Sequence, residues 1–454
     1  MSKRSSAFSH QSSNHPVIDA ATHRKFKIQN SPLPPWRTCQ LGGSTFFPIQ
    51  HSKSKITAQR HLLLNSTFKI QNSKSRALRV AILADFPLSA LEGGATGRGG
   101  GQGCTWLPQL AESLALYPEF EIHWVILDRK GNLPATFKAH GQTFHRIKGS
   151  SVSLDLALGN LPTRWTIRAF LRKLKPDIVH AWGTELIYPA ALRDFKGSKI
   201  LSMQGVLTEY QRIGGLPDDW RWRRMVANEP GMIRSATIVT SESEWGISRV
   251  KEVHPTAECR LVEYGVHPRF YEIPWQPDPE IPYLLYVGGA GSRKGFDVLL
   301  DALEMLPDRA WELRLAGDDE MRREVEARGL KNVCCLGLLP WDAMQKELQG
   351  AWAFVLPTRG DTSPNSVKEA RVIGLPVITT QHGGQAGYIR DGVNGRIVDP
   401  LDASHLAEAV TDVMSSIDRA RSLGNGHHEE DRAYLRPERT AEGFATIYRE
   451  LARC

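Results

Sequence analysis

The feature that most constrains the fold is an alternation of short apolar runs with amphipathic segments, which occurs twice along the chain. The first series runs from Leu78 to Thr240, and the second runs from Tyr283 to Thr380. In both, apolar runs of strand length are separated by segments with helical spacing. Strands that alternate with helices of about 10–15 residues are typical of right-handed βαβ units and a parallel sheet. The sequence therefore predicts an α/β fold with two Rossmann-like domains.

A proline-rich segment separates the two series and predicts an interdomain linker, Pro274-Trp275-Gln276-Pro277-Asp278-Pro279. We expect one domain over residues 77–273, a second over residues 274–430, and a C-terminal helix within residues 431–454 that crosses back to the first domain. Two α/β halves joined in this way would face each other across a cleft. Open α/β sheets bind ligands at the carboxyl ends of their strands, so the cleft is the expected binding site.

The basic charge of the chain is concentrated in its first 76 residues. The whole chain has a net charge of +8, but residues 1–76 hold 12 Lys and Arg and one acid, Asp19. The rest of the chain is therefore nearly neutral and gives no reason to expect a nucleic-acid partner. The first 76 residues are polar and lack a sustained period, so we expect a disordered tail. Its contact with membranes would be at most peripheral, since no amphipathic helix is evident.

Composition also indicates in which cellular compartment the protein is expected. No apolar run approaches the roughly 18–20 residues that a membrane-spanning helix needs. The six cysteines include no CxxC pair, which excludes a disulfide scaffold and favours a reducing compartment. We therefore expect a cytoplasmic protein; its oligomeric state is not encoded in any pattern that we can interpret.

Two candidate features follow predicted strands of the first domain. The loop from Gly93 to Gly103 has seven glycines in eleven residues. Such a loop could bring backbone amides close to an anion at a helix N-terminus, or it could be a flexible surface loop. His180 ends a buried strand, where it could face the cleft or could be a structural histidine with its hydrogen bonds satisfied.

Two further candidate features belong to the second domain. A glycine-rich turn carries Arg293 and Lys294, two adjacent cations that could neutralise a diphosphate or form an ordinary solvated turn. In the stretch from Asp361 to Glu369, Ser363 fits a helix N-cap and is followed by Pro364. The amides of the first helical turn would then point at an anion, and the two carboxylates could bind sugar hydroxyls. The alternative is a well-capped helix with an exposed Glu369.

Together these stretches resemble the retaining glycosyltransferases of family 4, which have the GT-B architecture of two Rossmann-like domains facing across a cleft. The resemblance covers roughly residues 78–450 and is strongest over residues 283–400. It implies that the second domain binds a nucleotide sugar and the first domain mainly binds the acceptor. It also implies catalytic roles for three residues, His180, Asp361 and Glu369. The donor contacts that it implies come from Arg293, Lys294, Gly295, Ser363, Asn365, Ser366, Glu369, Gly99, Gly100 and Gly101.

The sequence departs from the family pattern at three positions. Asp361 stands where the family usually has glutamate, which shortens the side chain by one methylene. Gly289 aligns with the usual phosphate-binding arginine, for which Arg293 could substitute. Gly387 aligns with a common acid, and nothing in the sequence explains this difference.

The resemblance implies transfer of a hexose-like sugar from a nucleotide diphosphate, with retention, to a glycan, lipid or small-molecule acceptor. The cations and the helix end would stabilise the leaving phosphates, so we expect neither a metal ion nor a cofactor besides the donor substrate. Three alternatives remain open. They are a glycoside hydrolase that uses the two acids, a nucleotide-sugar epimerase, and a catalytically impaired nucleotide-sugar-binding protein.

Overall fold

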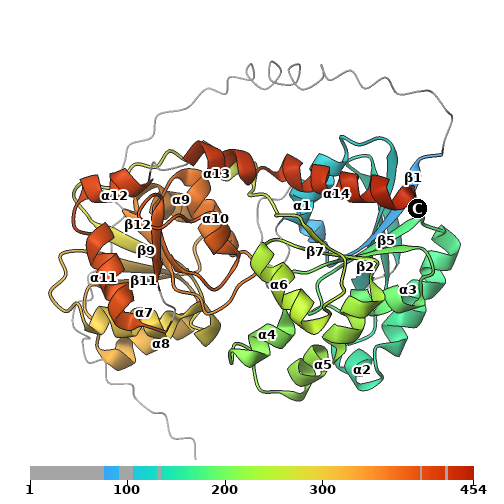
Figure 1. Cartoon of the computed structure of the whole chain (residues 1–454), viewed down its shortest axis with the longest axis horizontal. Coiled ribbons are helices and arrows are strands. Elements are labelled where there is room, and N and C mark those ends of the chain that lie inside the picture. The colour runs from blue at the N-terminus through green and yellow to red at the C-terminus, as the bar shows by residue number, and fades with distance from the viewer. Residues whose placement is uncertain (1–75, 92–105, 130–133, 399–400, 425–427, 454) are drawn as a thin grey trace, which may run out of the picture. The chain divides into compact units, whose positions relative to one another are not determined.

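The computed structural model describes residues 76–91, 106–129, 134–398, 401–424 and 428–453. Nearly all of the predicted tail lies outside this part of the chain, and so does the loop that contains Gly99, Gly100 and Gly101. The described residues belong to one compact unit. This unit contains two parallel-sheet lobes, so the predicted α/β class with two Rossmann-like domains is confirmed (Figure 1).

The first lobe is built around a sheet in which eight described strands lie side by side. In spatial order they are β3 (Ala135–Ala139), β4 (Gln142–Lys148), β2 (Phe120–Asp128), β1 (Leu78–Leu83), β5 (Ile178–Trp182), β6 (Ser198–Ser202), β7 (Ile238–Ser241) and β8 (Cys259–Leu261). Neighbouring strands are parallel except for the β3–β4 hairpin. The α-helices between them are α1 (Leu107–Leu114), α2 (Val152–Ala157), α3 (Leu161–Leu174), α4 (Leu207–Arg212), α5 (Trp220–Ser235) and α6 (Glu244–Val253).

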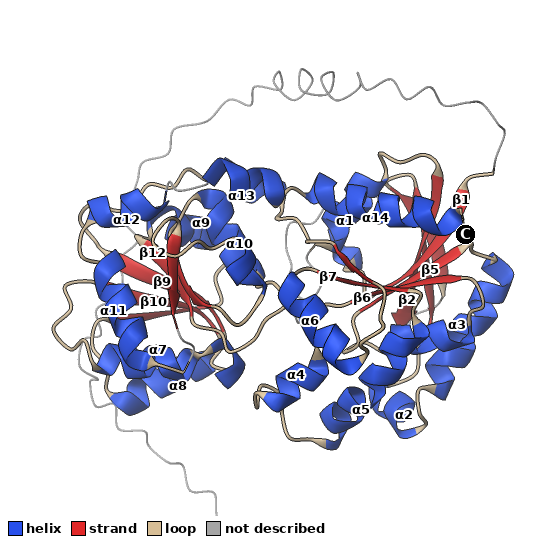
Figure 2. Cartoon of the chain, in the orientation of Figure 1, coloured by secondary structure: helices blue, strands red, loops and turns tan. Residues whose placement is uncertain are grey.

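Helices cover both faces of this sheet (Figure 2). Alternate residues of β1 point to opposite faces, as the pleat of a strand requires. Val80 and Ile82 pack into one apolar core, and Ala81 and Leu83 pack into the other. Burial on both faces explains why this strand is a continuous apolar run rather than an alternating one.

The second lobe has a parallel sheet of six described strands. Their order is β11 (Val333–Gly337), β10 (Glu312–Gly317), β9 (Tyr283–Gly288), β12 (Ala353–Leu356), β13 (Val377–Thr380) and β14 (Gly395–Val398). Its α-helices are α7 (Phe296–Glu304), α8 (Asp319–Arg328), α9 (Trp341–Gly350), α10 (Asn365–Ile373), α11 (Ala403–Val413), α12 (Ile417–Gly424) and α13 (His428–Tyr434). The strand order changes direction between β9 and β12, which is the switch point at which open α/β sheets bind ligands.

The last helix, α14 (Pro437–Ala452), belongs to the core of the first lobe. In Figure 1 it lies beside α1, although some 300 residues separate the two in sequence. Phe444 and Tyr448 are fully buried in the same apolar cluster as Val80 and Ile82. The chain therefore closes the first lobe with residues that follow the whole second lobe.

Among the described residues, every helix is too short or too polar to cross a lipid bilayer.

Candidate functional site

The site lies where the loop after β9 meets the loop after β12. These strands are neighbours in the sheet, so their carboxyl ends bring the two loops together. The backbone carbonyl of Arg293 accepts hydrogen bonds from Thr358 Oγ1, at 2.9 Å, and from the Arg359 amide, at 2.8 Å. The Arg359 guanidinium in turn binds both carboxylate oxygens of Asp297 on α7, each at 2.7 Å. These contacts fix the two loops to each other independently of Lys294 and Asp361.

Gly295 allows this close approach. Its φ is +70°, a left-handed conformation, and a Cβ atom there would lie 1.8 Å from the carbonyl oxygen of Pro357. Any other residue would have to separate the loops, since no flexible side chain can move away to relieve the contact. The glycine between Lys294 and α7 is therefore required by the packing of the two loops.

Asp361 is the centre of the charged cluster. Its Oδ2 accepts hydrogen bonds from Lys294 Nζ at 2.6 Å and from Arg293 Nη1 at 2.8 Å. Burial raises the pKa of Asp361, but Lys294 and Arg293 outweigh burial and lower this pKa to about 2. The carboxylate is therefore ionised at neutral pH, and the three side chains together carry one net positive charge. The Arg293 guanidinium also lies over the ring of Tyr210 from the first lobe, 4.5 Å from its centroid.

The helix that follows Asp361 begins one residue later than predicted. The N-cap of α10 is Pro364, and Ser363 is not the capping residue. The Ser363 hydroxyl instead donates a hydrogen bond to Glu263 Oε2 at 3.1 Å, and a hydrogen bond to a carboxylate is stronger than one to a backbone amide. Asn365 and Ser366 form the first turn, where backbone amides have no acceptor within the helix.

Lys368 is an important residue that the sequence analysis missed. It is fully buried, and its Nζ lies 3.0 Å from each of three acceptors, which are Glu242 Oε2, Glu263 Oε1 and the carbonyl of Tyr264. The acceptors belong to the first lobe and the lysine to the second. Burial lowers the pKa of Lys368, but the two carboxylates outweigh burial and hold this pKa above its ordinary value. The lysine therefore fixes the start of α10 to the first lobe.

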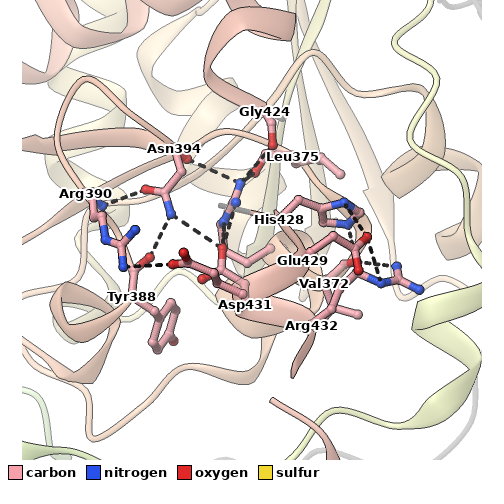
Figure 3. Close-up of polar contacts among 12 residues, drawn as sticks. Val372, Leu375, Tyr388, Arg390, Asn394, Gly424, His428, Glu429, Asp431 and Arg432 are labelled. Carbon is pink, nitrogen blue, oxygen red and sulfur yellow. Dashed lines mark hydrogen bonds and ion pairs between the residues drawn. The ribbon is translucent and has the colours of Figure 1, made fainter. Parts of the chain in front are cut away.

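The other end of α10 is held by α13 (Figure 3). The buried Arg371 guanidinium pairs with Asp431 at 2.7 Å. His428 Nε2 lies 2.8 Å from the carbonyl oxygen of Val372, and the same oxygen accepts a hydrogen bond from Arg432 at 2.9 Å. Because both ends of α10 are held, the residues between them have a fixed position.

Glu369 differs from Asp361 in its surroundings. It is half-buried on α10, and burial raises its pKa to about 7, although Arg269 and Lys368 act in the opposite direction. The two acids that the sequence analysis paired are thus in different states, with Asp361 ionised and Glu369 close to half-protonated at neutral pH. Such a difference in pKa between two acids is common at functional sites.

The expected location of His180 is wrong. Its side chain is fully buried inside the first lobe rather than facing the second lobe. Nδ1 lies 2.8 Å from the hydroxyl of Tyr448 on α14, and Nε2 lies 2.6 Å from Ser202 Oγ. Burial lowers the pKa of His180 to about 3, so the ring is neutral. With both nitrogens hydrogen-bonded inside the lobe, His180 fits the structural alternative, and its catalytic role stays a prediction.

One departure from the family pattern has a local explanation. A Cβ atom at Gly289 would lie 2.6 Å from Asp318 Oδ2, so a side chain there would displace this aspartate. Asp318 is the N-cap of α8, where its other carboxylate oxygen accepts the amide hydrogen of Met321 at 3.2 Å. The space that an arginine side chain at position 289 would need is thus occupied by the Asp318 carboxylate, which caps α8.

Comparison with known proteins agrees with this geometry. Residues 281–416 match the family described as Glycosyl transferases group 1. The lipopolysaccharide core biosynthesis glycosyltransferase LpsE of Rhizobium meliloti is 27% identical over 288 residues, which are 62% of this chain and 76% of the relative.

Within the part of the chain that the structure describes, no group of three or more His, Cys, Asp or Glu side chains could hold a metal ion.

Solved structures share the architecture. Sucrose-phosphate synthase from Thermosynechococcus elongatus superposes with a TM-score of 0.66 at 20% identity, over 83% of this chain and 99% of the synthase. HepE of Anabaena, solved in complex with UDP and glucose, superposes with a TM-score of 0.61 at 12% identity, over 82% of this chain and 100% of HepE. At such identities the likeness shows the fold alone, and this fold is GT-B.

Proposed function

Since residues 281–416 form a glycosyl transferases group 1 domain within a GT-B fold, we propose that the chain transfers a sugar from a nucleotide diphosphate donor to an acceptor, with retention of the anomeric configuration. The observation that carries this proposal is the cluster of Arg293, Lys294 and Asp361 at the switch point of the second sheet. Its net positive charge and the amide groups at the start of α10 suit a diphosphate. The lipopolysaccharide core relative supports a saccharide as the acceptor.

The proposed chemistry follows from where charge develops. The bond between the anomeric carbon and the diphosphate oxygen breaks, which leaves positive charge on the sugar and negative charge on the leaving group. Lys294 and Arg293 stabilise the leaving diphosphate, so a metal ion is not needed for this purpose. The acceptor oxygen bonds to the anomeric carbon on the face that the diphosphate leaves, and its proton passes to the departing phosphate. Asp361 orients the two cations and accepts a hydrogen bond from the transferred sugar.

Glu369 is proposed to bind the ribose of the donor. A carboxylate accepts hydrogen bonds from two vicinal hydroxyls, whereas a protonated carboxyl must use one oxygen as a donor. Donor binding therefore favours the ionised form of Glu369, whose pKa in the free protein is about 7.

This role predicts that donor affinity rises with pH. Because burial raises the pKa of Glu369 to about 7, its ionised fraction increases about tenfold between about pH 6 and about pH 8. The affinity for UDP-glucose, whose diphosphate does not titrate in this range, should increase by a similar factor. Isothermal titration calorimetry over this pH range measures it. The Glu369→Gln variant should bind more weakly at high pH and show a flat profile; equal slopes for both proteins would refute the role of Glu369.

The activity itself is tested with radiolabelled donors. The full chain is incubated with UDP-glucose, ADP-glucose or GDP-mannose and with a panel of saccharide, lipid and small-molecule acceptors. Transfer with an unchanged anomeric configuration, read by NMR, is the expected result. Free sugar as the sole product would indicate a hydrolase. An epimerised nucleotide sugar would indicate an epimerase. Tight donor binding with no product from any acceptor would favour a binding protein.

A further inference from the structure

The first lobe contains a polar cavity that the proposed function does not use. It has a volume of about 490 Å³ and lies between the start of α3, the 3₁₀ helix η3 (Tyr188–Asp194) and α5. We call it the arginine pocket, because its lining includes Arg164, Arg193 and Arg234 together with Asn160 and Asn228. None of the residues assigned above to the candidate site lines it.

Positive charge is in excess around the arginine pocket. Arg164 binds both carboxylate oxygens of Asp194, each at 2.8 Å. Arg193 and Arg234 are exposed, and no described residue forms a hydrogen bond or an ion pair with either guanidinium. Of the three arginines that line the pocket, only Arg164 is neutralised by a bound carboxylate, so the lining carries about two net positive charges. Guanidinium groups with free donors are suited to bind a phosphate in two-point contacts.

Two amide groups in the same pocket also lack partners. Asn160 is only 4% exposed, and no described group binds its Oδ1. The Nδ2 of Asn228 is buried and equally without a partner in the described structure. Buried polar atoms are normally hydrogen-bonded, and both asparagines line the pocket, so their side chains have unused hydrogen-bonding capacity beside it. One of them accepts and the other donates a hydrogen bond, which matches the hydroxyl groups of a polyol.

We propose that the arginine pocket binds a phosphate ester of a polyhydroxyl compound. Arg193 and Arg234 bind the phosphate, and Asn160 and Asn228 bind hydroxyl groups. Two sources have this chemistry, which are a soluble sugar phosphate and the headgroup of a phospholipid such as phosphatidylglycerol.

The test uses the full chain and reads binding rather than activity. Glucose 6-phosphate is titrated calorimetrically, with glucose and inorganic phosphate as partial probes, and binding to phosphatidylcholine vesicles with and without phosphatidylglycerol is measured by sedimentation. We expect either glucose 6-phosphate or the phosphatidylglycerol vesicles to bind, which identifies the source. The double variant Arg193→Ala/Arg234→Ala should weaken that binding by at least about tenfold. Arg224→Ala, an exposed arginine on α5 outside the pocket, should leave it unchanged.

The variant Lys294→Ala separates this site from the candidate donor site. Binding to the arginine pocket should persist in this variant, whatever happens to sugar transfer. Three results would overturn the proposal. They are absence of binding by both sources, binding that survives the double arginine variant, and, where the vesicles do not bind, glucose 6-phosphate binding no tighter than inorganic phosphate.

Discussion

Replacing Lys368 with methionine is expected to lower the free energy of unfolding by about 3–5 kcal/mol, since it removes one partner from a buried ion cluster. Glu242 and Glu263 would remain buried without the ammonium group that lies 3.0 Å from each. Methionine fills most of the space of the lysine, so the loss measures charge rather than packing. Urea denaturation measures the change. Lys346→Met, at an exposed lysine of α9 with no ion pair to a described residue, should change the free energy of unfolding little.

The loss of stability in the Lys368→Met variant should also depend on pH. Burial raises the pKa of both glutamates, and Lys368 opposes this. Without the lysine, the folded protein keeps protons on these acids that the unfolded chain, with a glutamate pKa near 4.3, releases. Stability therefore falls as pH rises from about 5 to about 8, more steeply than in the wild type. The triple variant Lys368→Met/Glu242→Gln/Glu263→Gln should lose this extra slope; if it keeps the slope, the two glutamates are not its source.

Among single substitutions in the candidate site, Lys294→Ala is expected to cause the largest loss of activity. If Lys294 stabilises the leaving diphosphate, kcat/KM for the nucleotide sugar should fall about 10²–10³-fold, as for other groups that stabilise charge in a transition state. The rate is measured with a saturating acceptor, and donor affinity is measured by calorimetry. Lys294→Arg should retain more activity, because it keeps the charge although it changes the geometry.

Two controls make this result specific. Lys346→Ala removes a lysine that is exposed on the same lobe and should leave the rate unchanged. Thermal denaturation should show that Lys294→Ala remains folded, because Asp361 keeps the hydrogen bond from Arg293 at 2.8 Å. A folded Lys294→Ala protein with the wild-type rate would contradict the proposed function.

The repeating elements could be predicted from sequence because their patterns are local. The apolar run that opens the second predicted series at Tyr283 is β9, and the last residue of that series, Thr380, ends β13. In a parallel sheet with helices on both faces, the central strands are buried on both sides, so their apolar runs can be recognised without knowing which helices cover them. The β3–β4 hairpin was missed, since β3 is largely exposed and gives no apolar run.

The candidate site could be predicted only in part. The cations of the β9 loop and the aspartate after β12 meet because parallel strands end at one edge, a rule that the sequence analysis could apply. The partners of His180, Ser363 and Lys368 could not be predicted, because each comes from a residue about 20 to 270 positions away. A lysine inside an otherwise buried helical face was the one available signal for Lys368, and it does not identify an acceptor.

The position of α14 has a consequence for biosynthesis. During translation, the first sheet leaves the ribosome long before residues 437–452, which supply Phe444 and Tyr448 to its core. Until then, one apolar face of the nascent first lobe is covered by α1 without α14, while the helices that cover the second sheet have already been made. We therefore expect the later-made lobe to become native first, and the earlier one to complete its core only once α14 has been made.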